Sequence, residues 1–483
     1  MGSATQRGVD GRALGWLVGL AVAAVALRWP FLQVPMITDE GAYAYVAHFW
    51  SRSYQLYRDI PFDRPQGIFL LYKLALLFGD GVATIRLGAA LYNAATCMAV
   101  FACADRLFDR PAAWCAAGAY ALFSAAPRIE GFTANAELFT LLPLVLSATL
   151  VWRGRWVGAG VLAGVATVIK PSGAAGLLLA LGWAACAPHR GRAWAQIVAG
   201  FCLAPLASAV HGWSVDWQAY WGSFVDRRLL LYSAVSSGVG TQLDNLIAGV
   251  RATVSSWILP AVLAAFTAIT RRERATTFAL LWLATCFPGM ALGGEWHWHY
   301  FQQVIPPLCV LAGGGVARWR APGVRWPWVV AAGLAAVWFA LGDLPFWNRS
   351  PDEISWTLYG RAGYLAAPQV ARAIDARTAP SASIYVAFAE AEIYFLAGRK
   401  AAVPQFFYRE VLYSAAVFEE VVGALQRGEA EMVVVAQAPP AARMSGDAFV
   451  ALLGQRYEPV QRFGPLVLLR RRPTNEHEHA GDR

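Results

Sequence analysis

Long apolar segments alternate with short polar segments along the first 344 residues of the chain. A membrane-spanning helix needs about 20 predominantly apolar residues, and fewer when it is distorted or re-entrant. The pattern therefore predicts about eleven spans. They are expected at residues 14–32, 82–104, 112–127, 138–152, 157–169, 173–187, 194–210, 250–269, 276–292, 301–316 and 328–344.

The loops between these segments predict how the chain is oriented. Arginine is concentrated in every second loop, first at Arg106 and Arg110 and last at Arg318, Arg320 and Arg325. Because loops rich in Lys and Arg stay in the cytoplasm, these loops and the N-terminus are predicted to be cytoplasmic. An odd number of spans then places the C-terminal region outside.

The segment 67–78 is apolar but short, and it carries Lys73. If it crossed the membrane, every later loop would change sides, so it is predicted to lie at the outer interface. The first outer loop then runs over 33–81, with 41–52 and 67–78 as juxtamembrane helices.

The pattern changes after residue 344, where charges become interspersed and long apolar runs stop. Helical spacing over 415–427, together with short β-type runs, predicts a small α/β domain over 345–470 with its own core. The β-type runs are 383–388, 431–436 and 466–469. The charged tail 471–483 is expected to be disordered.

Composition indicates a membrane protein. Of the 483 residues, 57% are hydrophobic and 15% are charged, with a mean hydropathy of +0.42, whereas a soluble chain carries about 25% charged residues. The net charge of +9 does not predict a nucleic-acid partner, because the basic residues form short clusters between apolar segments. The predicted fold class is an all-α polytopic membrane domain over 1–344, followed by a small extracytoplasmic α/β domain.

Two adjacent acids, Asp39 and Glu40, follow the first predicted span. Carboxylates at a membrane surface are costly to desolvate, so they need water, a cationic partner or a function that uses their charge. Both are predicted to belong to an active site. The alternative is that Asp39 caps a helix that starts near Gly41.

Two other outer loops carry polar residues that suit a binding site. Asp63 and Arg64 stand between prolines, and a fixed guanidinium is well suited to phosphate, although a turn with a local ion pair is the alternative. Glu130, Asn135 and Glu137 precede the next span. Glu137 there either favours the helix dipole or serves the site.

Lys170 lies at the outer end of a predicted span, where lysines commonly extend to the interface. In the segment 293–300, Glu295, His297 and His299 would point to one side of an extended chain. Such a trio predicts a site for a divalent cation or a phosphate. The alternative is an interfacial aromatic belt formed by the neighbouring Trp and Tyr side chains.

The order of these motifs is more specific than any one of them. It runs Asp39-Glu40, Asp63-Arg64-Pro65, Ala134-Asn135-Ala136-Glu137, Lys170-Pro171-Ser172, then His299-Tyr300 before Pro306-Pro307, with Arg-Leu-Phe-Asp-Arg-Pro at 106–111. Over 14–316 this order resembles the polytopic GT-C glycosyltransferases. Within them it is similar to the bacterial branch related to protein O-mannosyltransferases and to the lipid A aminoarabinose transferase. That transferase has Phe-Glu-Lys-Pro-Pro where this chain has Phe-Asp-Arg-Pro-Gln at 62–66.

The resemblance implies an outward-facing active site and a sugar donor carried on a polyprenyl phosphate. It implies that Asp39 is the catalytic base, with Glu40 beside it. A phosphate-linked sugar already has a good leaving group, so one carboxylate base is sufficient for inverting attack by an acceptor hydroxyl. The implied substrate- and phosphate-binding residues are Asp63, Arg64, Glu137, Lys170, His299 and Tyr300. A bound divalent metal is the alternative for stabilising the departing phosphate, with Asp63, Glu295, His297 and His299 as candidate ligands.

The function expected from the sequence is that of a hexosyl- or pentosyltransferase in the bacterial inner membrane. It would move a sugar from the polyprenyl-phosphate donor to a lipid, glycan or protein acceptor at the periplasmic face, among membrane lipids. The alternative is a transporter or flippase of polyprenyl lipids or solutes. A transporter is expected to carry charge near the bilayer midplane, whereas the ionisable residues here collect in the outer loops.

Overall fold

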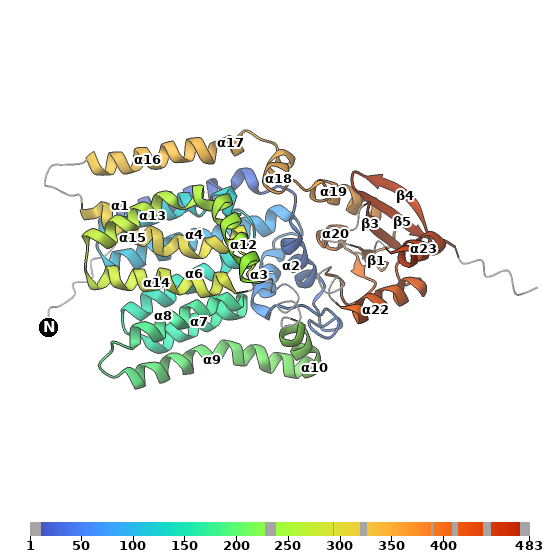
Figure 1. Ribbon diagram of the computed structural model, residues 1–483, viewed down its shortest axis with the longest axis horizontal. Helices are drawn as coiled ribbons and strands as arrows, with labels where there is room; N and C mark the ends of the chain where they lie inside the picture. The colour runs from blue at the N-terminus through green and yellow to red at the C-terminus, as the bar shows by residue number, and fades with distance from the viewer. Residues whose placement is uncertain are drawn as a thin grey trace, which may run out of the picture. The chain divides into compact units, whose positions relative to one another are not determined.

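The computed structural model describes residues 11–227, 238–292, 294–318, 326–387, 390–407, 414–437 and 446–473. The chain divides into two compact units (Figure 1). The first is made of Met1–Gln33, Arg64–His211 and Val235–Arg349, and the second of Val34–Asp63, Gly212–Ala234 and Ser350–Arg483.

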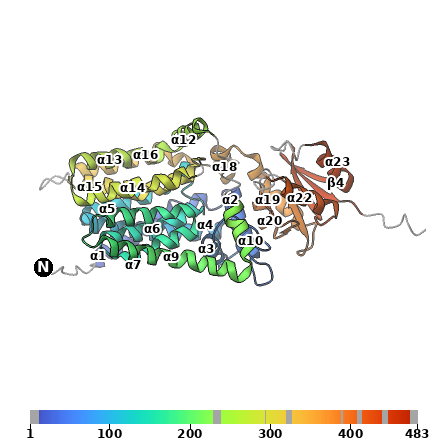
Figure 2. The same ribbon diagram turned by 60° about the horizontal axis from the view of Figure 1, so that its bottom comes forward.

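The first unit is helical. Its helices are α1 (Gly11–Ala26), α3 (Gln66–Leu76), α4 (Val82–Leu107), α5 (Arg110–Phe123), α6 (Ala136–Trp152), α7 (Trp156–Ile169), α8 (Ala175–Ala184), most of α9 (Arg190–Val215), α12 (Val239–Thr253), α13 (Ile258–Thr270), α14 (Arg274–Ala291), α15 (Ile305–Arg318), α16 (Trp326–Gly342) and α17 (Leu344–Trp347). Each apolar segment selected from the sequence coincides with one of these helices or with a bent pair of them. Figure 2 shows the α4–α6 and α13–α15 regions of this bundle from a second side.

The core of the first unit is built from small side chains on α4 and α5 and larger ones on α6, α14 and α15. Ala117 and Tyr120 of α5 are fully buried, as are Val145 of α6 and Leu311 of α15. Alanine lets the helix backbones approach, and the large side chains fill the remaining space. The cysteines at 97, 103, 286 and 309 are buried here, whereas Cys186 and Cys202 are exposed.

Three of the described helical segments are long and apolar enough to cross a membrane, namely Leu14–Phe31, Val82–Leu107 and Arg190–Val215. A fourth is added if α12 and α13 are counted as one span, but they are bent by 88°. The eleven predicted spans are therefore not confirmed. Several of the other helices are short, α8 having 10 residues, and the segment predicted at 250–269 is divided between α12 and α13 by a break at 254–257.

Glycines bring α7 and α9 into close contact. A Cβ atom on Gly164 would lie 2.3 Å from the carbonyl oxygen of Phe201, and one on Gly160 would lie 2.2 Å from that of Ile197. Across the contact, a Cβ atom on Gly200 would lie 2.3 Å from the carbonyl oxygen of Val157. The two backbones meet without side chains between them, as in other closely packed membrane helices.

We expect Gly164→Val to destabilise the folded protein by about 1–3 kcal/mol, because the added side chain must push the backbones of α7 and α9 apart. The matched control is Gly19→Val in α1, since a Cβ atom at Gly19 would have no neighbour within 4 Å. Thermal unfolding of the two variants in detergent measures the effect. Equal melting temperatures would show that α9 is not held by this contact.

The second unit contains a five-stranded sheet. The strands are β1 (Ser383–Val386), β2 (Lys400–Ala401), β3 (Met432–Ala436), β4 (Tyr457–Phe463) and β5 (Leu466–Arg471), in the order β2-β1-β3-β5-β4. β1 runs parallel to β2 and β3, and β5 runs antiparallel to β3 and β4. The helices of this unit include α2 (Thr38–Phe49), α10 (Trp217–Trp221), α18 (Pro351–Tyr359), α19 (Ala362–Asp375), α20 (Glu392–Ala397), α22 (Ala415–Gln426) and α23 (Asp447–Arg456).

The sequence predicted three of these five strands. β2 has two residues and is too short for a pattern to form. β4 is an edge strand whose middle positions are all exposed, and it contains Pro459, which edge strands tolerate. It therefore lacks the apolar alternation that identifies a half-buried strand.

The helix α2 belongs to the core of the second unit. A Cβ atom on Gly41 would lie 2.3 Å from the Cα atom of Glu392, so α2 and α20 meet backbone to backbone. The Tyr45 hydroxyl accepts a hydrogen bond of 3.0 Å from the Ala401 amide, and its ring packs 4.3 Å from that of Phe406. A helix near the start of the chain is thus held by residues more than 340 positions later.

Candidate active site

The loop between α5 and α6 has a tightly constrained backbone. Glu130 adopts φ of +54°, a left-handed conformation that is unusual for a residue other than glycine. A Cβ atom on Gly131 would lie 2.1 Å from the Ser124 carbonyl oxygen. The buried Arg28 donates hydrogen bonds to the carbonyl oxygens of Ser124 and Gly131, at 2.7 and 2.9 Å. This loop therefore holds the Glu130 side chain in a defined position.

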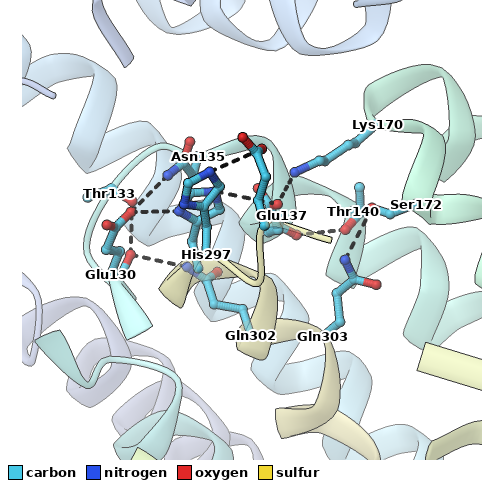
Figure 3. Close-up of polar contacts among 12 residues, drawn as sticks. Glu130, Thr133, Asn135, Glu137, Thr140, Lys170, Ser172, His297, Gln302 and Gln303 are labelled. Atoms are coloured by element: carbon cyan, nitrogen blue, oxygen red, sulfur yellow. Dashed lines mark hydrogen bonds and ion pairs between the residues drawn. The ribbon is translucent and has the colours of Figure 1, made fainter. Parts of the chain in front are cut away.

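Four ionisable side chains from different elements meet in the first unit (Figure 3). His299 lies between two carboxylates, with Nδ1 3.0 Å from an oxygen of Glu130 and Nε2 3.7 Å from an oxygen of Glu137. The same oxygen of Glu137 accepts a hydrogen bond from Lys170. All four residues are buried. We call Glu130, Glu137, Lys170 and His299 the buried charge cluster.

Amide and aromatic side chains support this cluster. Gln302 donates to the carbonyl oxygens of Ile129 and Glu130, at 2.9 and 3.1 Å, and therefore ties the 3-10 turn Trp298–Val304 to the Glu130 loop. The ammonium of Lys170 lies 4.3 Å from the centre of the Tyr300 ring, a cation–π contact. Asn135 donates to the Glu130 carboxylate at 3.0 Å.

The electrostatics of the cluster favour a charged His299. Burial lowers the pKa of His299, but the carboxylates of Glu137 and Glu130 outweigh it, so that its pKa is raised. With His299 protonated, two cations balance two carboxylates. Lys170 and His299, held in place by the carboxylates, can then attract an incoming anion, because electrostatic interactions are strong in a buried site.

Three acceptor atoms around the cluster lack a hydrogen-bond donor. Among the described residues, Asn135 Oδ1, Glu137 Oε2 and Gln303 Oε1 are buried and have no partner. Buried acceptors are normally satisfied, so these atoms indicate places for water or for the hydroxyl groups of a ligand.

Glu295, His297 and His299 do not lie on an extended chain as predicted, although the His297 and His299 rings stack with their centroids 5.5 Å apart. Residues 298–304 are a 3-10 helix and not an extended chain. His297 pairs with Glu295 at 3.2 Å, whereas His299 turns to Glu130. Within the described part of the chain, no three His, Cys, Asp or Glu side chains are placed to hold a metal ion.

The acids Asp39 and Glu40 belong to the second unit, in the first turn of α2. The helix begins at Thr38, so Asp39 is not the residue before it, and the capping role suggested by the sequence is wrong for this residue. Glu40 instead accepts a hydrogen bond from the Ile37 amide at 3.3 Å and is fully buried. Asp39 is partly exposed, which leaves its carboxylate accessible.

The remaining predicted residues, Asp63 and Arg64, stand on either side of a sequence boundary between the two units. Asp63 ends a segment of the second unit and Arg64 begins one of the first, and both are partly buried. The structure thus brings together Glu137, Lys170, His299 and Tyr300 from the predicted set. Their relation to Asp39 stays a prediction.

The structure adds contacts that the sequence did not indicate. Glu130 was noticed in its loop, but nothing in the sequence indicated its contact with His299. Gln66 donates to the Ser208 carbonyl at 3.1 Å and shares a 3.0 Å hydrogen bond with His211, which links α3 to α9. In the sequence, Gln66 stood out only because it occupies the position where the similar transferase has its second proline.

A group of acids also surrounds α20 in the second unit. Glu392 is fully buried, and within the described chain neither of its carboxylate oxygens has a hydrogen-bond partner. Glu390, Glu40, Tyr364 and Arg361 are its ionisable neighbours. Burial raises the pKa of Glu390 to about 7, and burial followed by Glu390 raises that of Glu392. Burial therefore favours the protonated, uncharged form of both carboxyl groups relative to an exposed glutamate.

We expect the second unit to lose stability as the pH rises. A carboxyl whose pKa is raised by folding stabilises the fold fully below its unfolded pKa of about 4.3, and this contribution disappears as the pH rises through the folded pKa. For Glu390 that window ends near pH 7. The melting temperature measured at pH 8 should be lower than that measured at pH 5.

The variant Glu392→Gln should reduce this decrease, because an amide that does not titrate replaces a carboxyl that loses its proton more easily in the unfolded chain than in the fold. The control Glu458→Gln changes an exposed glutamate of β4 and should keep the wild-type dependence. If Glu392→Gln were less stable than the wild type at pH 8, the buried carboxylate would have to be charged and bonded.

Comparisons with known proteins agree with this architecture. The family model described as dolichyl-phosphate-mannose-protein mannosyltransferase matches residues 63–213. The crystal structure of ArnT from Cupriavidus metallidurans bound to undecaprenyl phosphate is similar with a TM-score of 0.66, at 16% identity, over 95% of this chain and 98% of that one. AglB of Archaeoglobus fulgidus, an oligosaccharyltransferase in complex with an inhibitory peptide and a dolichol-phosphate, has a TM-score of 0.54 at 14% identity, over 92% of this chain and 71% of that one. No curated protein sequence matches the chain.

The fold is that of the GT-C glycosyltransferases, in a multi-pass membrane protein. The matches to ArnT and to the mannosyltransferase family model agree with the resemblance drawn from the order of the motifs.

Proposed function

We propose that the chain is a membrane glycosyltransferase that moves a sugar from a polyprenyl-phosphate donor to an acceptor hydroxyl at the periplasmic face. The observation that carries this is the fold match to ArnT over nearly the whole length of both chains, because ArnT was crystallised with undecaprenyl phosphate. The match of residues 63–213 to a mannosyltransferase family that uses dolichyl phosphate supports the same class of donor.

The transfer is a single displacement with inversion. The acceptor oxygen attacks the anomeric carbon, the bond between that carbon and the phosphate oxygen breaks, and polyprenyl phosphate leaves. Asp39 takes the proton of the acceptor hydroxyl, which its partly exposed carboxylate is free to do. Glu40 holds the first turn of α2 and so keeps Asp39 in place.

The negative charge on the leaving phosphate needs cations. Arg64, Lys170 and His299 supply them, and the buried charge cluster keeps the last two oriented before substrate arrives. Preorganised cations in a buried site stabilise developing charge without the cost of reorienting water. Asn135 Oδ1 and Glu137 Oε2, which have no hydrogen-bond partner among the described residues, are suited to accept hydrogen bonds from the hydroxyl groups of a sugar.

Mass spectrometry of cell-envelope lipids, glycans and glycoproteins, with and without the protein, tests this function. A species that differs by the mass of one sugar and returns on complementation is the expected result. Movement of a polyprenyl-linked substrate across vesicles containing the purified protein, without any sugar transfer, would instead support a transporter.

A further inference from the structure

A groove of about 560 Å³ lies between α1, α4 and α5 in the first unit. Its walls are apolar along most of its length, with Leu17 and Ala21 from α1 and Met98 from α4. One end is charged, where it is lined by Asp105, Arg106 and Arg110. The groove is separate from the buried charge cluster and takes no part in the proposed transfer.

The charged end has an excess of positive charge. Two guanidinium groups face one carboxylate, and Arg110 is 3.7 Å from Asp105, beyond a normal hydrogen bond. Arg106 is exposed, and one of its nitrogens donates to the Ala102 carbonyl oxygen of its own helix at 2.9 Å. Both arginines therefore have donors left for a further anion.

The apolar part of the groove lies on membrane helices. α1 with its following turn and α4 are two of the three described segments that can cross a bilayer. α1 is also anchored at its far end, where the fully buried Arg28 bonds to the loop after α5. The groove thus has fixed walls, a hydrocarbon-like interior and a cationic end at the termini of its helices.

We propose that this groove binds an anionic phospholipid. One acyl chain lies along Leu17, Ala21 and Met98, and the phosphate is held by Arg106 and Arg110. Guanidinium groups bind phosphate through paired hydrogen bonds, and basic residues at helix ends attract anionic lipid head groups. The net positive charge at the mouth selects against a zwitterionic lipid.

Native mass spectrometry of the full-length protein, delipidated in detergent and titrated with phosphatidylglycerol or phosphatidylcholine of equal chain length, tests this site. Phosphatidylglycerol should bind about tenfold more tightly or better. Arg106→Gln with Arg110→Gln should remove that preference and lower phosphatidylcholine binding much less, because that lipid has the phosphate but no net charge. The control pair Arg190→Gln and Arg192→Gln, exposed arginines at the start of α9, should keep it.

The variant Ala21→Trp examines the apolar part, because a large side chain there would fill the groove and lower the binding of both lipids. Equal binding of the two lipids to the wild type would overturn the proposal. So would a phosphatidylglycerol preference that survives removal of both Arg106 and Arg110.

Discussion

Replacing Asp39 by Asn is expected to lower sugar transfer by about two to four orders of magnitude, the usual contribution of a general base. The amide has the shape of the carboxyl but cannot take the proton of the acceptor hydroxyl. Asp39 is partly exposed in the first turn of α2, so the loss of its charge should cost the fold little. Transfer from a polyprenyl-phosphate sugar by the purified variant, with membrane fractionation to establish insertion, measures the effect.

The control for this experiment is Asp59→Asn, which changes another acid of the segment Val34–Asp63, one that pairs with Arg58. It should transfer sugar at nearly the wild-type rate. Full turnover by the Asp39 variant would remove this residue as the base. Glu40→Gln separates the roles of the two acids. Because the Glu40 side chain is fully buried, we expect this change to lower the melting temperature of the protein and to affect transfer only indirectly.

Replacing Lys170 by Met is expected to both destabilise the protein and abolish transfer. The change leaves the buried Glu137 with only His299, 3.7 Å away, as a cationic neighbour, and breaking a buried ion pair in this way costs roughly 3–5 kcal/mol. It also removes one of the cations assigned to the leaving phosphate. Thermal unfolding and transfer are measured on the same preparation.

The double variant Lys170→Met with Glu137→Gln distinguishes the two roles. Because the unpaired charge is then absent, stability should largely return, while transfer should not. If the double variant recovered both, Lys170 would serve only to neutralise Glu137. If the single variant were as stable as the wild type, the pair would not be ionised as the geometry indicates.

The helices of the first unit were predictable because their information is local. An apolar run long enough for a helix is visible in any window of the sequence, and all eleven such segments are helical. What the pattern could not tell was where a helix breaks, as at 254–257 between α12 and α13, or which helices are too short to cross a membrane by themselves. Those outcomes depend on neighbouring helices and not on the segment.

The candidate site shows the same division. Glu137, Lys170 and His299 could be selected because charge is rare beside apolar segments and therefore conspicuous. Their partners could not, since the contact between Glu130 and His299 joins residues 169 positions apart. Likewise, Asp39 and Glu40 look alike in sequence, and only the structure separates an accessible carboxylate from a buried one.

The sequence by itself indicated a helical membrane protein that resembles the GT-C glycosyltransferases, because hydropathy and motif order can be read along the chain without knowing its contacts. The tertiary structure decided that α2 packs on α20, and that Glu392 lies buried with no hydrogen-bond partner among the described residues. It also decided that Glu130, Glu137, Lys170 and His299 meet in one cluster. The physical reason is that burial and ion pairing depend on which distant segments become neighbours, and that is settled only when the chain packs.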